Sequence, residues 1–268
     1  MLLPATVEEC YTMAMDAFDL AERFQTLVFV MSDLDLGMNT WMAPTFTYPE
    51  KPIDRGKVLD SESLQRLGEW GRYKDVDGDG IPYRTVPGTG MPAYFARGSG
   101  HNDKAQYSER PDDYVSNMER LERKFETARQ YVPKPIVANA PGEIGIIGYG
   151  TSHWAIDESL AQLENETGMR PAYLRLRAYP FTKELSTFID RYKRIYVVEQ
   201  NRDAQMLGLM RLEMAPDRIA RLRSVLHYNG LPIDARSVSD AILVQEGRKA
   251  AESVGRSVVS AALAAGGE

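Results

Sequence analysis

The segment 97–103 combines residue types that could bind a substrate and move a proton. His101 can change its charge near neutral pH, and the amide of Asn102 beside it can donate or accept a hydrogen bond. Two glycines let such a loop approach a ligand closely or move over it. A surface turn with a bystander histidine would contain the same residues. The candidate substrate or active-site loop residues are Arg97, Gly98, Gly100, His101, Asn102 and Asp103.

A second polar group, formed by Asp33, Asp35 and Asn39, follows the apolar run 27–31. A run of this kind is typical of a parallel strand that is covered on both faces. Polar residues just past the carboxyl end of such a strand usually face a ligand or an interface. Structural capping of a local turn is the alternative. We therefore expect these residues to be interface or cofactor-proximal groups, or else caps.

The run from Asp75 to Gly80 matches the first half of a calcium-binding loop. Oxygen ligands alternate at Asp75, Asp77 and Asp79, and glycine takes the sixth position. The twelfth position, where a bidentate glutamate belongs, is Val86, and no helix is expected before the loop. The three aspartates are therefore metal-ligand candidates. The alternative is a set of Asx turns, in which the carboxylates accept hydrogen bonds from nearby amides.

The glycine-rich turn from Gly145 to Gly150 invites comparison with turns that direct free amides at phosphates. Its spacing is G-x-x-G-x-G rather than G-x-G-x-x-G, and the next expected strand ends in Arg175-Leu-Arg177, without an acid to bind a ribose. We therefore expect a tight strand-to-helix turn that needs glycine. His153, on the first turn of the following helix, is expected to be a surface or interface histidine.

The first half of the chain places a helix and a strand before a long loop-rich stretch. Thr6 to Glu9 forms a capping box, and apolar residues at helical spacing predict a helix that ends near Arg23. Turn-forming residues dominate 32–107, where a helix is predicted only around 63–70. The elements expected after it are an amphipathic helix over 111–128 and an extended linker over 132–135.

After the linker, strands and helices alternate, which predicts parallel strands joined by right-handed crossovers and hence an α/β fold. The predicted strands are 144–147, 173–176 and 195–198, and the predicted helices are 152–166, 182–192, 204–214, 219–226 and 239–264. The strand at 27–31 and the helix before it cannot cover their own apolar faces. The rest of that sheet is therefore expected to come from elsewhere.

Composition excludes several classes of protein. The 268 residues are 43% hydrophobic and 26% charged with a net charge of −6, which is typical of a globular chain without the basic surface of a nucleic-acid-binding protein. Cys10 is the only cysteine, so the chain cannot hold an iron–sulfur cluster alone. No apolar run approaches the ~18 residues of a membrane span, and no signal peptide is apparent. We expect a cytoplasmic protein that binds neither nucleic acid nor membranes.

Five segments, in the same order, resemble the α subunits of 2-oxoacid:ferredoxin oxidoreductases, particularly the 2-oxoglutarate type. They are FVMSDLDLGMN (29–39), YKDVDGDGIPYR (73–84), RGSGHN (97–102), VEQN (198–201) and HYNGLPIDAR (227–236). The resemblance implies an α/β chain with four parts. These are the C-terminal remnant of a pyrimidine-type thiamine-diphosphate-binding domain (1–60), a loop-rich segment with a long helix and a linker (61–135), a small parallel-sheet, transketolase C-terminal-like domain II (136–235), and a C-terminal helix and tail (236–268).

The resemblance also implies a reaction: oxidative decarboxylation of a 2-oxoacid to an acyl-CoA, with the electrons passed to ferredoxin. In the family, the β subunit binds the diphosphate and Mg and carries the 4Fe–4S cluster, so we expect this chain alone to bind none of them. The implied partners are the β subunit, ferredoxin, coenzyme A and the 2-oxoacid. The segment 97–103 resembles a loop near the thiamine site, where His101, Asn102 and Asp103 would contact or gate the substrate.

The chain departs from the family pattern because it has no counterpart of the Tyr-Pro-Ile-Thr-Pro-type motif, the activating glutamate or the substrate-binding arginine. The catalytic residues are therefore expected outside this chain. We expect it to be the C-terminal part of an α subunit, or a split subunit, that is inactive alone. The residues do not separate 2-oxoglutarate from pyruvate or branched 2-oxoacids. A non-catalytic assembly module and a calcium-dependent structural protein are the alternatives from other classes.

Overall fold

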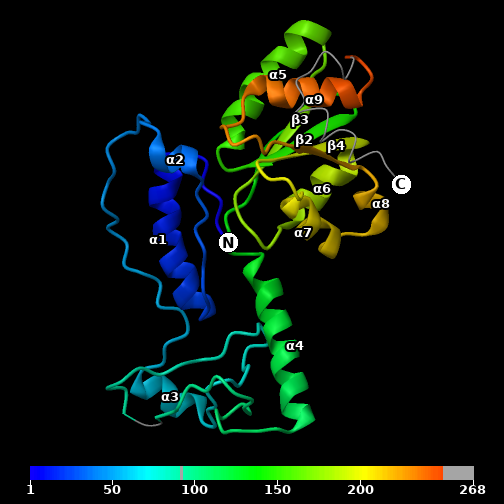
Figure 1. Cartoon of the computed structure of the whole chain (residues 1–268). Helices are drawn as coiled ribbons and strands as arrows, with labels where there is room; N and C mark the ends of the chain where they lie inside the picture. Colours follow the sequence, from blue (N-terminus) through cyan, green and yellow to red (C-terminus); the bar gives the residue numbers. More distant parts are fainter. Residues whose placement is uncertain (91–92, 250–268) are drawn as a thin grey trace. The chain divides into compact units, whose positions relative to one another are not determined.

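The computed structural model describes residues 1–90 and 93–249, which form two compact units (Figure 1). Each unit gathers stretches that are distant in the sequence. Unit 1 contains residues 1–13, 30–46 and those from 133 onward, and unit 2 contains residues 14–29 and 47–132. Helix α1 (Val7–Phe24) runs from the first unit into the second. None of the helices in the described residues is long and apolar enough to cross a membrane.

Unit 1 is built on a five-stranded sheet with the order β1-β3-β2-β4-β5. The three predicted strands are present and parallel: β2 (Ile144–Tyr149), β3 (Ala172–Leu176) and β4 (Arg194–Glu199). Two further strands lie at the edges, β5 (Leu222–Leu226) parallel to β4 and β1 (Ile136–Ala138) antiparallel to β3. The α/β prediction is therefore confirmed, but the sheet is mixed rather than purely parallel.

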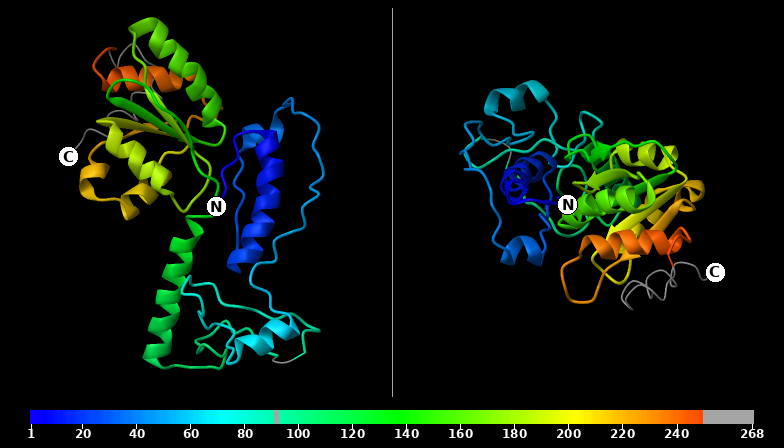
Figure 2. Two further views of the ribbon diagram at one scale, coloured as in Figure 1. Left: turned by 180° about the vertical axis from the view of Figure 1, so that it is seen from behind. Right: turned by 90° about the horizontal axis from the view of Figure 1, so that it is seen from above.

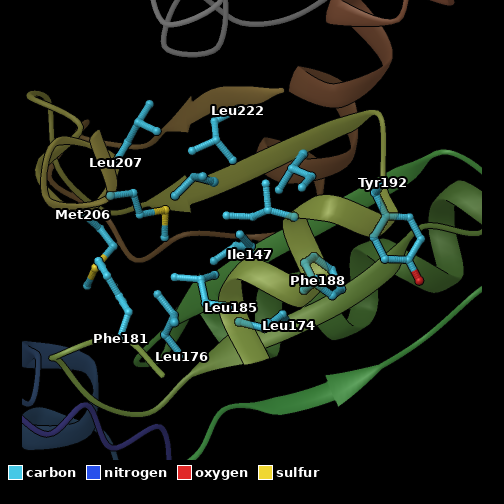
Figure 3. Close-up of a cluster of buried hydrophobic side chains, with 14 of the residues drawn as sticks. Ile147, Leu174, Leu176, Phe181, Leu185, Phe188, Tyr192, Met206, Leu207 and Leu222 are labelled. Carbon is cyan, nitrogen blue, oxygen red and sulfur yellow. The ribbon is translucent and has the colours of Figure 1, made fainter. Parts of the chain in front are cut away.

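Helices cover both faces of this sheet (Figures 1 and 2). On one face, apolar side chains of α5 (Ser152–Thr167) and α9 (Ala235–Gln245) pack against the strands. On the other face, α6 (Lys183–Arg191) and α7 (Gln205–Glu213) form a second core. Figure 3 shows this second core, in which Leu174 and Leu176 of β3 meet Leu185 and Phe188 of α6. Each fully buried leucine stabilises the folded state by roughly 1.5–3 kcal/mol. The two cores therefore supply most of the apolar packing that stabilises the sheet of unit 1.

The predicted helix over 219–226 is wrong. The short helix α8 (Pro216–Ile219) ends there, and Leu222–Leu226 forms β5. Ile219, Leu222 and Leu226 stand at helical spacing, but the backbone groups of this segment pair with the exposed edge of β4, and this tertiary pairing overrides the local pattern. The predicted helix over 239–264 is also misplaced. Helix α9 begins at Ala235, and the part of that prediction beyond residue 249 lies outside the described residues.

The run 27–31, predicted as a buried strand, forms no strand ladder within the described residues. Because the rest of its sheet is expected to come from elsewhere, its burial stays a prediction. Leu27 and Phe29 are 82% and 62% exposed, and Val30 makes a single bridge to Leu2. Among the described residues no longer strand lies beside this run, so its backbone has no ladder in which to pair. Beside Val30 in unit 1, the buried residues are Leu2 and Leu3. The amide of Leu3 donates to the Arg177 carbonyl at 2.8 Å.

Unit 2 is loop-rich, as predicted, and contains α3 (Ser61–Leu67) and α4 (Pro111–Ala128) besides the second part of α1. Its loops pack closely on α4. A Cβ atom at Gly80 would lie 2.2 Å from the backbone nitrogen of Lys124, and Gly80 has a φ of +79°, so only glycine fits there. Its buried apolar side chains in the described residues are Leu20, Phe24, Leu59, Ile81, Ala105 and Val132.

Candidate functional site

A cavity of about 690 Å³ opens in unit 1 at the carboxyl ends of the parallel strands. Its walls come from the turns that follow β2, β4 and β5, together with residues 31–39. This edge of an open α/β sheet is where ligands usually bind, because the turns there bring polar groups from several strands together. The lining residues are Leu3, Met31, Ser32, Asp33, Leu34, Asp35, Met38, Asn39, Tyr149, Gly150, Ser152, Gln200, Gly230, Leu231 and Pro232.

Asp33 joins residues 31–39 to the start of α5. Its Oδ1 atom accepts a hydrogen bond from the Leu36 amide at 3.1 Å and so caps α2 (Leu34–Met38). Its Oδ2 atom accepts from the Thr151 amide at 3.2 Å and from the Thr151 hydroxyl. A carboxylate at the N-terminus of a helix is favourable, because the unpaired amides there carry partial positive charge. Asp33 therefore acts as a cap for two helices as well as a wall of the cavity.

The glycines before α5 serve close packing. A Cβ atom at Gly148 would lie 2.2 Å from Ile156 Cδ1, and one at Gly145 would lie 2.9 Å from the Phe188 ring. The Thr151 amide, which follows the glycines at the start of α5, is already bonded to Asp33, so it is not free for a phosphate. These contacts support the structural interpretation of the turn over nucleotide binding.

The end of β4 supplies a buried carboxylate and a half-buried side-chain amide in succession. Glu199 is fully buried, and its oxygens accept from the Met206 and Leu207 amides at 2.8 and 3.1 Å, which caps α7. Burial and the neighbouring Glu199 raise the pKa of Tyr149, whose hydroxyl donates to that carboxylate at 3.2 Å. Gln200 faces the cavity, and its Nε2 donates to the Thr151 and Ser152 hydroxyls. Glu199 is thus structural, whereas Gln200 belongs to the cavity wall.

The predicted residues Asp33, Asp35 and Asn39 do line one cavity, whereas Tyr149 and Gln200 were missed by the sequence reasoning. The available signal was their place at the ends of predicted strands. In the described residues the lining holds two carboxylates and several apolar side chains but no lysine, arginine or histidine. Such a surface suits a group that brings hydrogen-bond donors or positive charge, and it does not suit a phosphate.

The loop 97–103 belongs to unit 2. The His101 ring stacks on Tyr73 with centroids 3.8 Å apart, and its Nδ1 lies 3.1 Å from the Asn102 carbonyl oxygen. The Asn102 side chain accepts the Lys104 and Gln106 amides at 3.0 Å each, so it builds the turn itself.

The rest of this loop is tied down at several points. The Asp103 carbonyl accepts the Tyr73 amide at 2.8 Å, and Arg97 Nε donates to the Ala105 carbonyl at 3.2 Å. A Cβ atom at Gly100 would lie 2.5 Å from the Ser108 carbonyl oxygen, whereas Gly98 faces open space. The structure thus holds the predicted residues in a hydrogen-bonded turn of unit 2.

The aspartates at 75–79 are held by protein groups. Asp75 Oδ2 accepts the Gly80 amide at 3.0 Å and Arg123 Nε at 3.1 Å. Lys57 Nζ donates to Asp77 and Asp79 at 2.6 and 2.8 Å. Asx-type turns and a lysine thus take the place of the calcium site that the pattern suggested.

Neither a metal cluster nor an activated thiol stands out among the described residues. No cluster of three or more His, Cys, Asp or Glu side chains in the described part of the chain is placed to hold a metal ion. Burial raises the pKa of the Cys10 thiol, and Asp33 and Glu9 add to this effect, which is the opposite of a metal-binding thiolate. These residues therefore do not fit a magnesium diphosphate or an iron–sulfur cluster.

A buried ion pair fastens the start of α1 to the sheet. Glu9 accepts hydrogen bonds from Arg175 Nη1 and Nη2 at 2.6 and 2.8 Å, from Arg177 Nε at 3.0 Å and from the Ala5 amide at 2.9 Å. Nearby, His153 is half-buried with Nδ1 3.3 Å from the Tyr173 hydroxyl. Burial, with the Arg175 charge, lowers the pKa of His153, so this histidine favours the neutral form.

Comparison with known proteins was made by sequence and by structure. No family model matches the sequence. The chain is 25% identical over 243 residues to the 2-oxoacid:ferredoxin oxidoreductase subunit alpha of Saccharolobus solfataricus, covering 87% of this chain and 37% of that protein. It is 26% identical over 250 residues to 2-oxoacid:ferredoxin oxidoreductase 1, subunit alpha, of Aeropyrum pernix, covering 90% and 38%. It is 23% identical over 201 residues to 2-oxoglutarate synthase subunit KorA of Methanocaldococcus jannaschii, covering 75% and 52%.

The fold matches that of 2-oxoglutarate:ferredoxin oxidoreductase from Magnetococcus marinus, solved with 2-oxoglutarate, coenzyme A and succinyl-CoA bound. The TM-score is 0.80 at 23% identity, over 92% of this chain and 42% of that chain. The predicted resemblance is confirmed: the chain is a distant homologue of 2-oxoacid:ferredoxin oxidoreductase α subunits. It spans about two fifths of the length of the first two relatives.

Proposed function

We propose that this chain is part of the α subunit of a 2-oxoglutarate:ferredoxin oxidoreductase. The complete enzyme would convert a 2-oxoacid to an acyl-CoA and pass the electrons to ferredoxin. Distant homology over 87% and 90% of the chain supports the enzyme class. The preference for 2-oxoglutarate rests on the resemblance of the segments in the sequence and on the names of the KorA relative and of the solved Magnetococcus enzyme.

The observation that carries the proposal is the convergence of three resembling segments on one cavity. Residues from 29–39, 198–201 and 227–236 are distant in the sequence, yet members of all three line the cavity of unit 1. A fold that only needed stability would not have to bring the segments that resemble an enzyme family to the carboxyl edge of the sheet. We assign this edge to the contact between the α and β subunits, with Asp33, Asp35 and Asn39 as interface residues.

The chain is proposed to be inactive alone. Cys10 cannot bind a 4Fe–4S cluster by itself, and the described residues contain no group of three or more His, Cys, Asp or Glu side chains that could hold a metal ion. Thiamine diphosphate, Mg and the cluster would be bound mainly by the β subunit, and the catalytic groups would lie outside this chain. Within it, His101, Asn102 and Asp103 are proposed to contact or gate the substrate.

The test is dye reduction that depends on 2-oxoglutarate and coenzyme A, measured with the chain alone and with the complete complex. We expect reduction by the complex only, faster with 2-oxoglutarate than with pyruvate or a branched 2-oxoacid. His101→Ala should lower turnover far more than assembly, whereas Lys104→Ala, on the same exposed loop, should change neither. Reduction by the chain alone would refute the proposed division of labour. Unchanged turnover in His101→Ala would remove His101 from the site.

A non-catalytic assembly module is the second candidate, favoured by one observation: both oxygens of Asp33 are already engaged by protein groups. Under this alternative the chain would bind the partner subunit, but no 2-oxoacid would be oxidised by the resulting complex. Asp35→Ala, which leaves the two caps intact, should weaken assembly under either candidate. Activity of the assembled complex therefore separates the two.

A further inference from the structure

Tyr73 in unit 2 lies beside two arginine side chains. The Arg72 guanidinium carbon is 5.0 Å from the Tyr73 ring centroid, and that of Arg120 is 5.6 Å away. Arg72 belongs to the loop-rich segment and Arg120 to α4, so two separate elements bring like charges to one ring. Lys124 follows Arg120 by one turn of α4 and adds a third cation.

The two arginines are short of partners in the described residues, whereas Lys124 Nζ donates to the Phe24 carbonyl at 3.2 Å. Arg120 is only 8% exposed, and its Nη1 donates to the Gly80 carbonyl at a long 3.3 Å. In the part of the chain that the structure describes, its Nε is buried without a hydrogen-bond partner, as are Arg72 Nε and Nη1. The indole Nε1 of Trp70 is likewise buried and unpartnered. Buried donors are nearly always satisfied in native proteins. The four unpartnered donors on Trp70, Arg72 and Arg120 therefore indicate a missing acceptor.

The nearby negative charge does not balance these cations. Asp75 acts on Arg120, and its Oδ2 atom is shared by the Gly80 amide and Arg123. Its Oδ1 atom is buried without a partner in the described residues, which leaves one acceptor atom for these four unpartnered donors. Burial, together with the charges of Arg120 and Arg72, lowers the pKa of Lys124 to about 8. Burial is the larger cause of this lower pKa, and the two arginine charges add to it.

We propose that Arg72 and Arg120 form a binding site for an oxyanion, the carboxylate or phosphate group of a small molecule, with Trp70 Nε1 as a further donor. The planar guanidinium group presents paired donors that match the oxygens of either anion. An anion would satisfy the orphaned donors and offset the charge. The site is independent of the cavity in unit 1 and does not rest on the proposed enzymatic function.

The competing explanation is purely structural. Arg72 also lies 5.4 Å from the Tyr94 ring centroid, so cation–π contacts with two tyrosines could hold it without any ligand. Under that explanation anions would act on this protein only through ionic strength.

The test is a calorimetric titration of the full chain with inorganic phosphate and with malonate, at an ionic strength held constant with sodium chloride. We expect saturable binding of at least one anion to one site. Arg72→Gln should weaken it by at least about tenfold, because charge-assisted hydrogen bonds are lost. Arg66→Gln removes an exposed arginine of the same unit and should leave binding unchanged.

The two anions distinguish the ligand chemistry: binding of phosphate alone identifies a phosphate site, and binding of malonate alone a carboxylate site. Arg120→Gln is the second variant, and its fold is checked by circular dichroism because Arg120 is buried. Arg72, which is only partly buried, keeps the test valid if the Arg120 variant does not fold. Absence of saturable binding by both anions, or binding unaffected by Arg72→Gln, would overturn the proposal.

Discussion

Replacing Glu9 by glutamine should destabilise unit 1 by about 3–5 kcal/mol, because the change leaves the buried guanidinium of Arg175 without its counter-ion. The Arg175 side chain is 6% exposed and that of Glu9 is 13% exposed, so water cannot take over the lost interaction. The carboxylate accepts four hydrogen bonds, three of them from the guanidinium groups of Arg175 and Arg177. Glutamine can keep some of these contacts but brings no charge.

The predicted loss is large compared with the total stability of the protein. A domain is typically stable by about 5–15 kcal/mol, so 3 kcal/mol is a substantial share of it. Since about 1.4 kcal/mol corresponds to a factor of ten, the ratio of folded to unfolded unit 1 should fall at least roughly a hundredfold.

Urea unfolding followed by tryptophan fluorescence measures this loss in a Trp70→Phe background. Trp41 and Trp154, whose rings are 5.8 Å apart, both belong to unit 1 and then report on that unit alone. The control is Glu164→Gln, which breaks the exposed pair with Arg170 and should cost at most about 1 kcal/mol.

A second variant and a pH series sharpen the test. Glu9→Gln combined with Arg175→Met should recover part of the stability, because no unpaired charge remains buried. Burial opposes ionisation of Glu9, but the hydrogen bonds from Arg175 and the Ala5 amide outweigh it and lower the pKa of Glu9. The contribution of Glu9 should therefore be present above the ordinary value of 4.5 and be lost as the pH falls through the lower folded value. Equal losses in Glu9→Gln and Glu164→Gln would refute the reasoning.

Two further predictions concern packing and pH. Gly148→Ala should lower the free energy of urea unfolding by about 1–3 kcal/mol, because its Cβ would lie 2.2 Å from Cδ1 of the buried Ile156. Gly208→Ala is the control: this position faces open space in α7, so the change should be neutral or stabilising by up to about 1 kcal/mol. Equal effects of the two changes would contradict the packing argument. Unit 2 should gain thermal stability between pH 8 and pH 10.5, because unfolded Lys124 still binds the proton that the folded form releases at about 8. Lys124→Met should flatten this rise and the exposed Lys104→Met should not, so an unchanged profile in Lys124→Met would count against the assignment.

The sequence predicted the centre of the sheet but not its edges. Strands β2, β3 and β4 have continuous apolar cores separated by helices of ordinary length, and such runs have few alternatives. The edge strands were missed for two reasons. β1 has three exposed residues and no periodicity, and β5 carries a pattern that also fits a helix. In both cases the neighbouring strand decides the conformation, and that neighbour is not local in the sequence.

Part of the cavity lining could be predicted from the sequence. Asp33, Asp35 and Asn39 follow the apolar run 27–31, which makes no ladder within the described residues, and they line the cavity at the ends of other strands. Gln200 stands directly after a strand that was predicted, but its role depends on the turn after β2, which the sequence could not place beside it. The unpartnered donors around Arg72 could not be predicted from the sequence either, because burial and the lack of a hydrogen-bond partner depend on the tertiary structure.

The two units are interleaved in the sequence, and this determines the order in which they can fold during translation. The Leu3 amide donates to the Arg177 carbonyl, so the pairing of this segment has to wait for one that is translated about 170 residues later. At roughly 5–20 residues per second this delay is on the order of ten seconds or more, during which the apolar residues Leu2 and Leu3 have no sheet to cover them. Unit 2, whose last residue is Val132, is complete before β2 has been translated. The chain would therefore finish its second unit first, and the segment with Leu2 and Leu3 would stay uncovered until the sheet of unit 1 has formed.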